Sequence, residues 1–204
     1  KVIPSTIEFM DRSSIRCSEK ASPMGIPEDI GGLLLIEVDG SEEALMPQVE
    51  KVKRILADQD VVRCDVTRDP AEADKLWQAR RALSQATYNL NPVKIAEDVV
   101  VPRSNIPALI RALEAFEKKY GIPILSFGHA GDGNFHVSIM IKDTPEDRAK
   151  AEDAVKDIFT ETLRLGGTLS GEHGIGTSKA AYIHMELSPE VMAAMKSIKT
   201  LFDP

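Results

Sequence analysis

The sequence predicts an α+β domain whose sheet is mainly antiparallel and covered by helices. Two observations carry this prediction: single strands alternate with isolated helices along the chain, and residues 123–141 have the pattern of a β-hairpin. This arrangement is typical of ferredoxin-like units, and we expect the helices to pack on one face of the sheet. The 204 residues are enough for one such domain with its own core, so we expect 1–204 to be a single domain.

The first part of the chain is expected to alternate between helices and strands. Residues 5–17 are predicted to form a short helix, and residues 31–40 form a strand bounded by glycines. Apolar residues at helical spacing predict a helix over 41–59, with Pro47 tolerated because it comes early. Residues 61–69 alternate apolar and polar side chains, which predicts a second strand.

The middle of the chain has clearer boundaries. The predicted helix over 70–88 begins with a proline, which is favoured at the first helical position. Residues 94–102 have the apolar, β-branched composition of a strand. A capped helix over 103–121 ends at a glycine and is followed by the hairpin over 123–141.

The last part of the chain is expected to be mostly helical. A capped helix is predicted over 143–167, where a pair of glycines ends it. Residues 168–176 are predicted to be a short strand that runs into a glycine-rich turn. Two helical segments, near 177–186 and 189–202, complete the prediction.

Composition excludes several classes of protein. The net charge is −7 and there is no basic cluster, so we expect no nucleic-acid partner. No apolar run approaches ~18 residues, so we expect no membrane span. The two cysteines lie far apart, which fits reduced thiols in a cytoplasmic protein. The chain begins at Lys1 rather than at a methionine, and we expect it to be part of a longer protein.

Two histidines lie symmetrically about an Asp-Gly dipeptide in the predicted hairpin. If Asp132 and Gly133 form a two-residue turn, His129 lies directly opposite His136, with Cβ atoms ~4.5–5.5 Å apart. Two imidazoles at that distance can share a metal ion. The alternative is that both histidines are structural members of a half-buried hairpin.

A second candidate segment is "SGEHGIG", in which a glutamate and a histidine stand between glycines. Side chains on such a backbone are accessible and do not belong to a packing stripe. We assign Glu172 as a third ligand beside the two hairpin histidines, giving an open site for Zn, Mn or Fe. His173 is then free for proton transfer, which suits its ordinary pKa near ~6.5.

Four segments together resemble a known family: "LWQARRAL", "KIAEDVVVPRSNI", "GHAGDGNFH" and "SGEHGIG". They are similar to the C-terminal cap domain of FAD-linked oxidases. The resemblance is to a group within the vanillyl-alcohol-oxidase superfamily. This group comprises D-lactate dehydrogenase, D-2-hydroxyglutarate dehydrogenase and the FAD-linked chain of glycolate oxidase. The resemblance covers nearly all of the sequence.

The resemblance implies a function and a set of partners. The cap would close over an FAD that is held mostly by an N-terminal domain absent from this chain. The substrate would be a small D-2-hydroxy acid, and electron-transfer subunits could join the enzyme, holding it peripherally at a membrane. The resemblance implies residue roles as follows: metal ligands His129, His136 and Glu172; catalytic base His173; carboxylate-binding residues Arg80 and Lys94.

Two other functions remain open at this level. The same donors could serve a stand-alone metallohydrolase, with the remaining histidine as its base. The chain could also be a non-catalytic interaction domain whose histidines are structural. For the leading interpretation, we expect the chain to fold without the flavin-binding domain but to be inactive in its absence.

Overall fold

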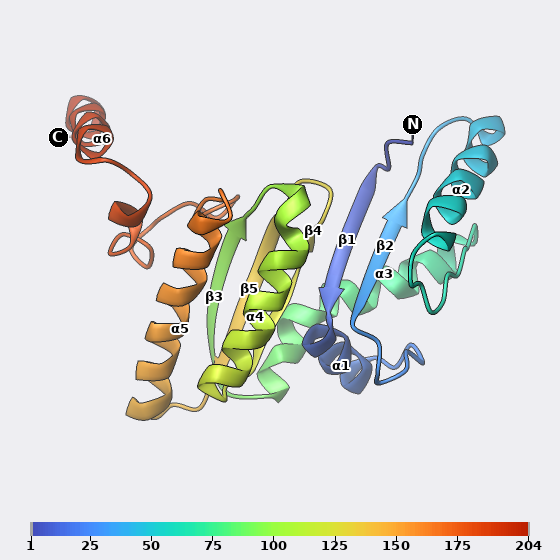
Figure 1. The fold of residues 1–204 in the computed structure, drawn as a ribbon, viewed down its shortest axis with the longest axis horizontal. Helices are drawn as coiled ribbons and strands as arrows, with labels where there is room; N and C mark the ends of the chain where they lie inside the picture. The colour runs from blue at the N-terminus through green and yellow to red at the C-terminus, as the bar shows by residue number, and fades with distance from the viewer. Residues whose placement is uncertain (1, 204) are drawn as a thin grey trace.

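Five strands form one antiparallel sheet in the order β2-β1-β4-β5-β3, as seen in a computed structural model that describes residues 2–203 (Figure 1). Every neighbouring pair in this sheet is antiparallel, which confirms the predicted fold class. The strands are β1 Thr6–Asp11, β2 Gly32–Glu37, β3 Val93–Val100, β4 Ile124–His129 and β5 Asn134–Ile141.

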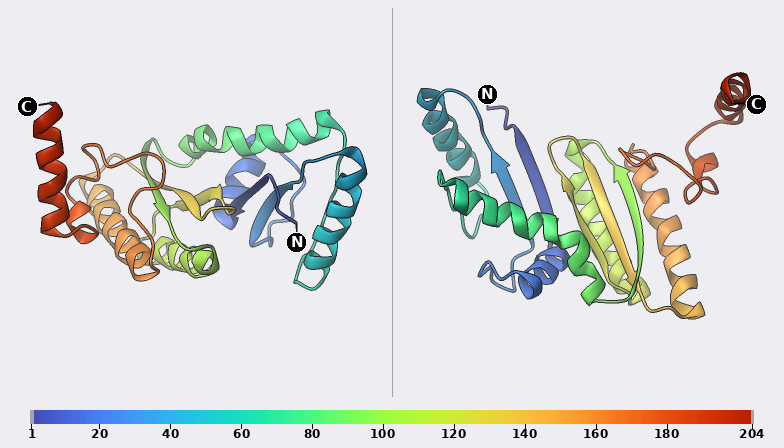
Figure 2. Two further views of the ribbon diagram at one scale, coloured as in Figure 1. Left: turned by 90° about the horizontal axis from the view of Figure 1, so that it is seen from above. Right: turned by 180° about the vertical axis from the view of Figure 1, so that it is seen from behind.

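Helices cover both faces of the sheet rather than one (Figure 2). α4 and α5 pack on one face, and α1 and α3 pack on the other. α2 and α6 lie at opposite ends of the molecule, and neither has a buried side chain (Figure 1). The helices are α1 Arg12–Ala21, α2 Glu42–Ala57, α3 Pro70–Ala86, α4 Ile106–Tyr120, α5 Pro145–Arg164 and α6 Pro189–Phe202.

The central strands explain why the one-face expectation was wrong. Successive side chains of a strand point to opposite faces, and β4 carries buried apolar side chains on both faces. Ile124 packs in the core formed with α4 and α5, whereas Leu125 and Phe127 pack in the core formed with α1 and α3. Two apolar faces need two layers of helices, because either face left exposed would lose its hydrophobic stabilisation.

The ferredoxin-like pattern is contained in the second half of the chain. β3, α4, β4, β5 and α5 follow one another, and β5 lies between β3 and β4. A further strand would pair with β3 after α5, but here it is reduced to one antiparallel bridge between Val100 and Thr168. The strand expected in 168–176 is therefore a single bridge. β1 and β2 extend the sheet on the side of β4.

Three further predicted elements differ from the structure. Residues 5–17 were expected to form a helix, but they contain β1 followed by the first part of α1. Asp11 marks the change, because its side chain accepts a hydrogen bond from Ser14 N and caps the helix. Residues 61–69 form no strand, since their exposed side chains face no partner strand. In 177–186 the structure has only a 3₁₀ turn, Ile183–Met185.

None of the helices within residues 2–203 combines the length and the apolar character needed to cross a membrane.

Candidate active site

A row of polar side chains crosses four strands on the face covered by α1 and α3. Glu8 on β1 lies opposite His129 on β4, and His136 on β5 lies opposite Asp98 on β3. Directly opposed residues of antiparallel strands point to the same face. The row lies beside the turn that joins β4 to β5, beyond the apolar cluster that the same face forms with α3.

The register of the hairpin differs from the prediction by two residues. His129 pairs with Asn134, and His136 pairs with Phe127. The turn has four residues, with His129 O accepting hydrogen bonds from the N–H groups of Asp132 and Gly133. Because a shift of two residues preserves the face, the two imidazoles still lie together, with ring centroids 5.5 Å apart.

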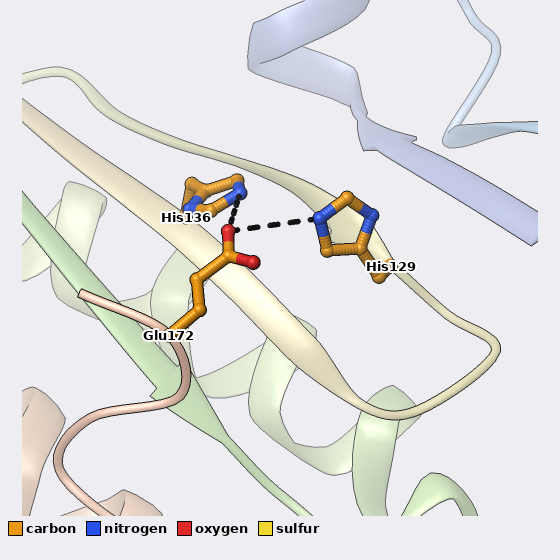
Figure 3. A group of neighbouring side chains, drawn as sticks. All are labelled: His129, His136 and Glu172. Atoms are coloured by element: carbon orange, nitrogen blue, oxygen red, sulfur yellow. Dashed lines mark ion pairs between the residues drawn. The ribbon is translucent and has the colours of Figure 1, made fainter. Parts of the chain in front are cut away.

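Glu172 reaches both histidines from the loop that follows α5 (Figure 3). Its Oε1 lies 3.3 Å from His136 Nε2 and 3.8 Å from His129 Nε2. One ligand atom from each residue lies within 4.8 Å of the other two. Atoms that bind one ion at about 2.1 Å lie about 3 to 3.5 Å apart, so these donors fit a divalent metal after small side-chain adjustments.

The surroundings of His136 favour its neutral, metal-binding form, and those of His129 orient its ring. Burial lowers the pKa of His136 below its ordinary value, against the opposing effect of Glu172. His129 Nδ1 contacts Glu8 Oε1, which leaves Nε2 facing Glu172. A carboxylate on the far nitrogen of a ligand histidine fixes the tautomer and the orientation of the ring.

His173 lies next to the three donors without joining them. Its ring stacks on that of His136, with centroids 5.2 Å apart and planes 16° apart. Its Nδ1 lies 3.7 Å from Asp98 Oδ1, and the side chain is about half exposed. An imidazole held beside the metal donors and open to solvent can accept a proton from a bound ligand and pass it on.

Arg80 approaches the site through Glu8. Its Nε and a terminal nitrogen lie 2.9 and 2.7 Å from Glu8 Oε2. Its guanidinium also lies over the Phe127 ring, 4.6 Å from the centroid. Arg80 therefore already holds a carboxylate of the protein itself, and this carboxylate also contacts His129.

Lys94 lies away from the cluster. It precedes Asp98 by four residues on β3, about 13 Å along the strand. Its Nζ donates to the carbonyl and hydroxyl oxygens of Ser84 on α3, at 3.2 and 2.9 Å. Burial lowers the pKa of this lysine. The structure thus brings five of the six predicted site residues together, with Arg80 linked to the others through Glu8. The sixth, Lys94, lies on the same face of the sheet but apart from them.

Sequence reasoning missed Glu8 and Asp98, which support the site. Glu8 was hidden because its strand was interpreted as part of a helix. Asp98 carried a usable signal: it adjoins Glu97 between apolar residues of the strand, and buried charges need partners. Lys179 is the partner, but its distance along the chain gave no reason to pair it with Asp98.

A family model described as "FAD linked oxidases, C-terminal domain" matches residues 1–204. The chain belongs to this family. One relative of this FAD-linked oxidase domain, the glycolate oxidase subunit GlcD of Bacillus subtilis, is 40% identical over all of this chain and 44% of its own length. The D-lactate dehydrogenase of Anaerostipes hadrus is 33% identical over 98% of the chain and 44% of its own length. The chain thus spans less than half the length of these relatives.

Solved structures support the fold of this FAD-linked oxidase domain. A 4-ethylphenol oxidase from Gulosibacter chungangensis superposes with a TM-score of 0.59 and 14% identity, over 97% of this chain and 45% of the oxidase. An alkyldihydroxyacetonephosphate synthase gives a TM-score of 0.58 with 16% identity, over the whole chain and 38% of the synthase. At these identities the likeness concerns the fold alone.

Proposed function

We propose that this FAD-linked oxidase domain binds a divalent metal and the substrate of an enzyme that oxidises a small D-2-hydroxy acid to the 2-oxo acid. The observation that carries the proposal is the convergence of His129, His136 and Glu172 on one point beside His173. The names of the relatives, glycolate oxidase subunit and D-lactate dehydrogenase, support this substrate class. The metal ligands would be these three residues, and the remainder of the polypeptide would hold most of the FAD.

Each residue has a distinct task in this proposal. A bound divalent ion supplies Lewis acidity that lowers the pKa of an alcohol, and FAD supplies the acceptor for a hydride. His173 takes the proton of the substrate hydroxyl at the ring nitrogen that faces away from Asp98. Its stacking on His136 keeps that nitrogen beside the metal donors.

The cationic residues would hold the substrate carboxylate. Arg80 has one guanidinium nitrogen, Nη1, beyond the two that bind Glu8, and its N–H groups can donate to a substrate carboxylate. Lys94 would have to exchange its bonds to Ser84 for a substrate carboxylate. It would therefore serve a longer substrate or act after α3 moves.

The test combines metal analysis with flavin reduction. The purified chain is exposed to Zn²⁺ or Mn²⁺, dialysed, and analysed for bound metal; about one ion is expected, and none when His129 and His136 are both replaced by alanine. In the enzyme that contains its flavin domain, D-lactate or glycolate should bleach the flavin anaerobically, and His173→Ala should abolish this.

The alternatives give different results in the same experiments. Unchanged metal content in the double alanine variant, together with lost stability, would show that the histidines are structural. Metal-dependent hydrolysis of esters or amides by the chain, with no effect of FAD, would favour a metallohydrolase.

A further inference from the structure

The loop that carries Glu172 and His173 has almost no regular structure of its own. Between the end of α5 and the 3₁₀ turn at Ile183 it makes one strand-like bridge, at Thr168. The side chains of Glu172 and His173 need a fixed backbone, because the residues of a metal or catalytic site must be held within about 0.5 Å of their productive positions. Something outside the loop must therefore hold it.

Asp98 is the acceptor that holds the loop. Its Oδ2 accepts three consecutive backbone N–H groups, from Gly171 at 2.9 Å, Glu172 at 2.7 Å and His173 at 2.9 Å. Its Oδ1 accepts from the hydroxyl of Ser170 at 3.3 Å. Successive N–H groups that converge on one anion form a nest, and here the anion is a side chain of the sheet.

Lys179 neutralises this carboxylate from the far end of the same loop. The Lys179 ammonium contacts Asp98 Oδ1 and donates to the carbonyl oxygens of Asp98 and Leu169, at 2.9 and 2.7 Å. The side chain of Asp98 is 0% exposed and that of Lys179 is 4% exposed. Because both side chains are buried, the pair contacts neither solvent nor a partner at the surface.

Position on the sheet links the pair to the metal donors. Asp98 lies directly opposite His136, so one strand register fixes both the loop and a ligand. Burial alone would raise the pKa of Asp98, but the bonds from Lys179, His173 and Glu172 outweigh it and hold the pKa well below its ordinary value. The carboxylate thus remains an anion that accepts from the loop.

We propose that the buried Asp98–Lys179 pair is the clamp that sets Glu172 and His173 against the hairpin histidines, which makes both members positioning residues. The consequence for metal binding rests on the proposed function, whereas the effect on the loop does not. Removing the pair frees residues 170–179 from the sheet while the β3–β5 pairing remains.

The test uses two variants and one control, each measured in the chain. Lys179→Met keeps the length of the side chain and removes the charge. Because this removes the ammonium from two buried carboxylates, Asp98 and Glu97, whose Oε2 lies 3.6 Å from it, the double variant Asp98→Asn/Lys179→Met, which also removes the charge of Asp98, is measured beside it. Lys150→Met on α5, whose partner Glu146 is exposed, is the control for losing a lysine elsewhere.

Amide hydrogen exchange and Zn²⁺ affinity are the two measurements. In the double variant we expect the amides of Gly171, Glu172 and His173 to lose protection, while those of β3 and β5 keep it. Zn²⁺ affinity, measured against a chromophoric chelator, should fall about 10- to 100-fold, the usual loss when a group that supports a ligand is removed. Lys150→Met should change neither.

Three results would overturn the clamp or separate it from the function. Wild-type loop protection with wild-type affinity in the double variant would show that the pair does not hold the loop. Loss of protection across the whole sheet in both variants would show that it supports the fold in general. If the wild-type chain binds no Zn²⁺, the proposed function fails, and hydrogen exchange alone still decides whether the clamp exists.

Discussion

The Glu8–Arg80 pair should be among the costliest interactions to break in the molecule. The perturbation is Glu8→Gln, which keeps the shape of the side chain and removes its charge. Only 5% of the Glu8 side chain and 11% of the Arg80 side chain are exposed, and the closest contact is 2.7 Å. Breaking a buried ion pair from one side costs about 3–5 kcal/mol, because the remaining charge is left without a partner.

A double-mutant cycle isolates the pairwise contribution. The free energy of unfolding in urea is measured for Glu8→Gln, for Arg80→Met and for the double variant. We expect each single variant to lose about 3 kcal/mol or more, and the double variant to lose less than their sum by about 1–3 kcal/mol. Part of the loss from Arg80 is its packing over Phe127, which the cycle removes from the coupling energy.

A second pair on the same helix gives a matched control. Arg81 and Asp74 also lie 2.7 Å apart, but their side chains are 58% and 55% exposed. Their coupling energy should be at most about 1 kcal/mol. If Glu8→Gln costs no more than Asp74→Asn, the reasoning that burial makes the Glu8 pair strong is wrong.

Three further outcomes are expected from the same structure. Gly171→Ala should lower the free energy of unfolding by about 1–3 kcal/mol and weaken Zn²⁺ binding, because the new Cβ would lie 2.5 Å from Asn134 Oδ1. The control is Gly131→Ala, which has open space around its Cβ. It should change neither the Zn²⁺ affinity in chelator competition nor the stability in urea unfolding. Burial raises the pKa of Asp11 to about 7, so its contribution to stability is present below about pH 4 and is lost as the pH rises through 7. Asp11→Asn should therefore flatten the dependence of the free energy of unfolding on pH over this range, measured in urea. An unchanged slope would contradict the raised pKa of Asp11. The chain without its flavin domain should not oxidise D-lactate or glycolate in a dye-reduction assay, and measurable turnover would refute the division of labour proposed above.

The hairpin shows how far local sequence determines the site. Side chains alternate between the two faces of a strand, and this period of two determined the face that each histidine occupies. The turn was harder to predict, since Asp132 and Gly133 occupy the last two positions of a four-residue turn rather than the centre of a two-residue one. The even shift kept the two imidazoles on one face, so their proximity was predicted correctly with a wrong register, and the metal that they would share remains a prediction.

The sequence by itself determined the α+β class, the antiparallel hairpin, most helices, and the segments that meet at the site. These depend on local periodicity, caps and turns, which act over a few residues. Only the tertiary structure decided that β1 is a strand, that helices cover both faces, and that Glu8 and Asp98 support the donors. Such contacts join residues far apart in the chain, as Asp98 and Lys179 are, and no local pattern specifies which buried charge finds which partner.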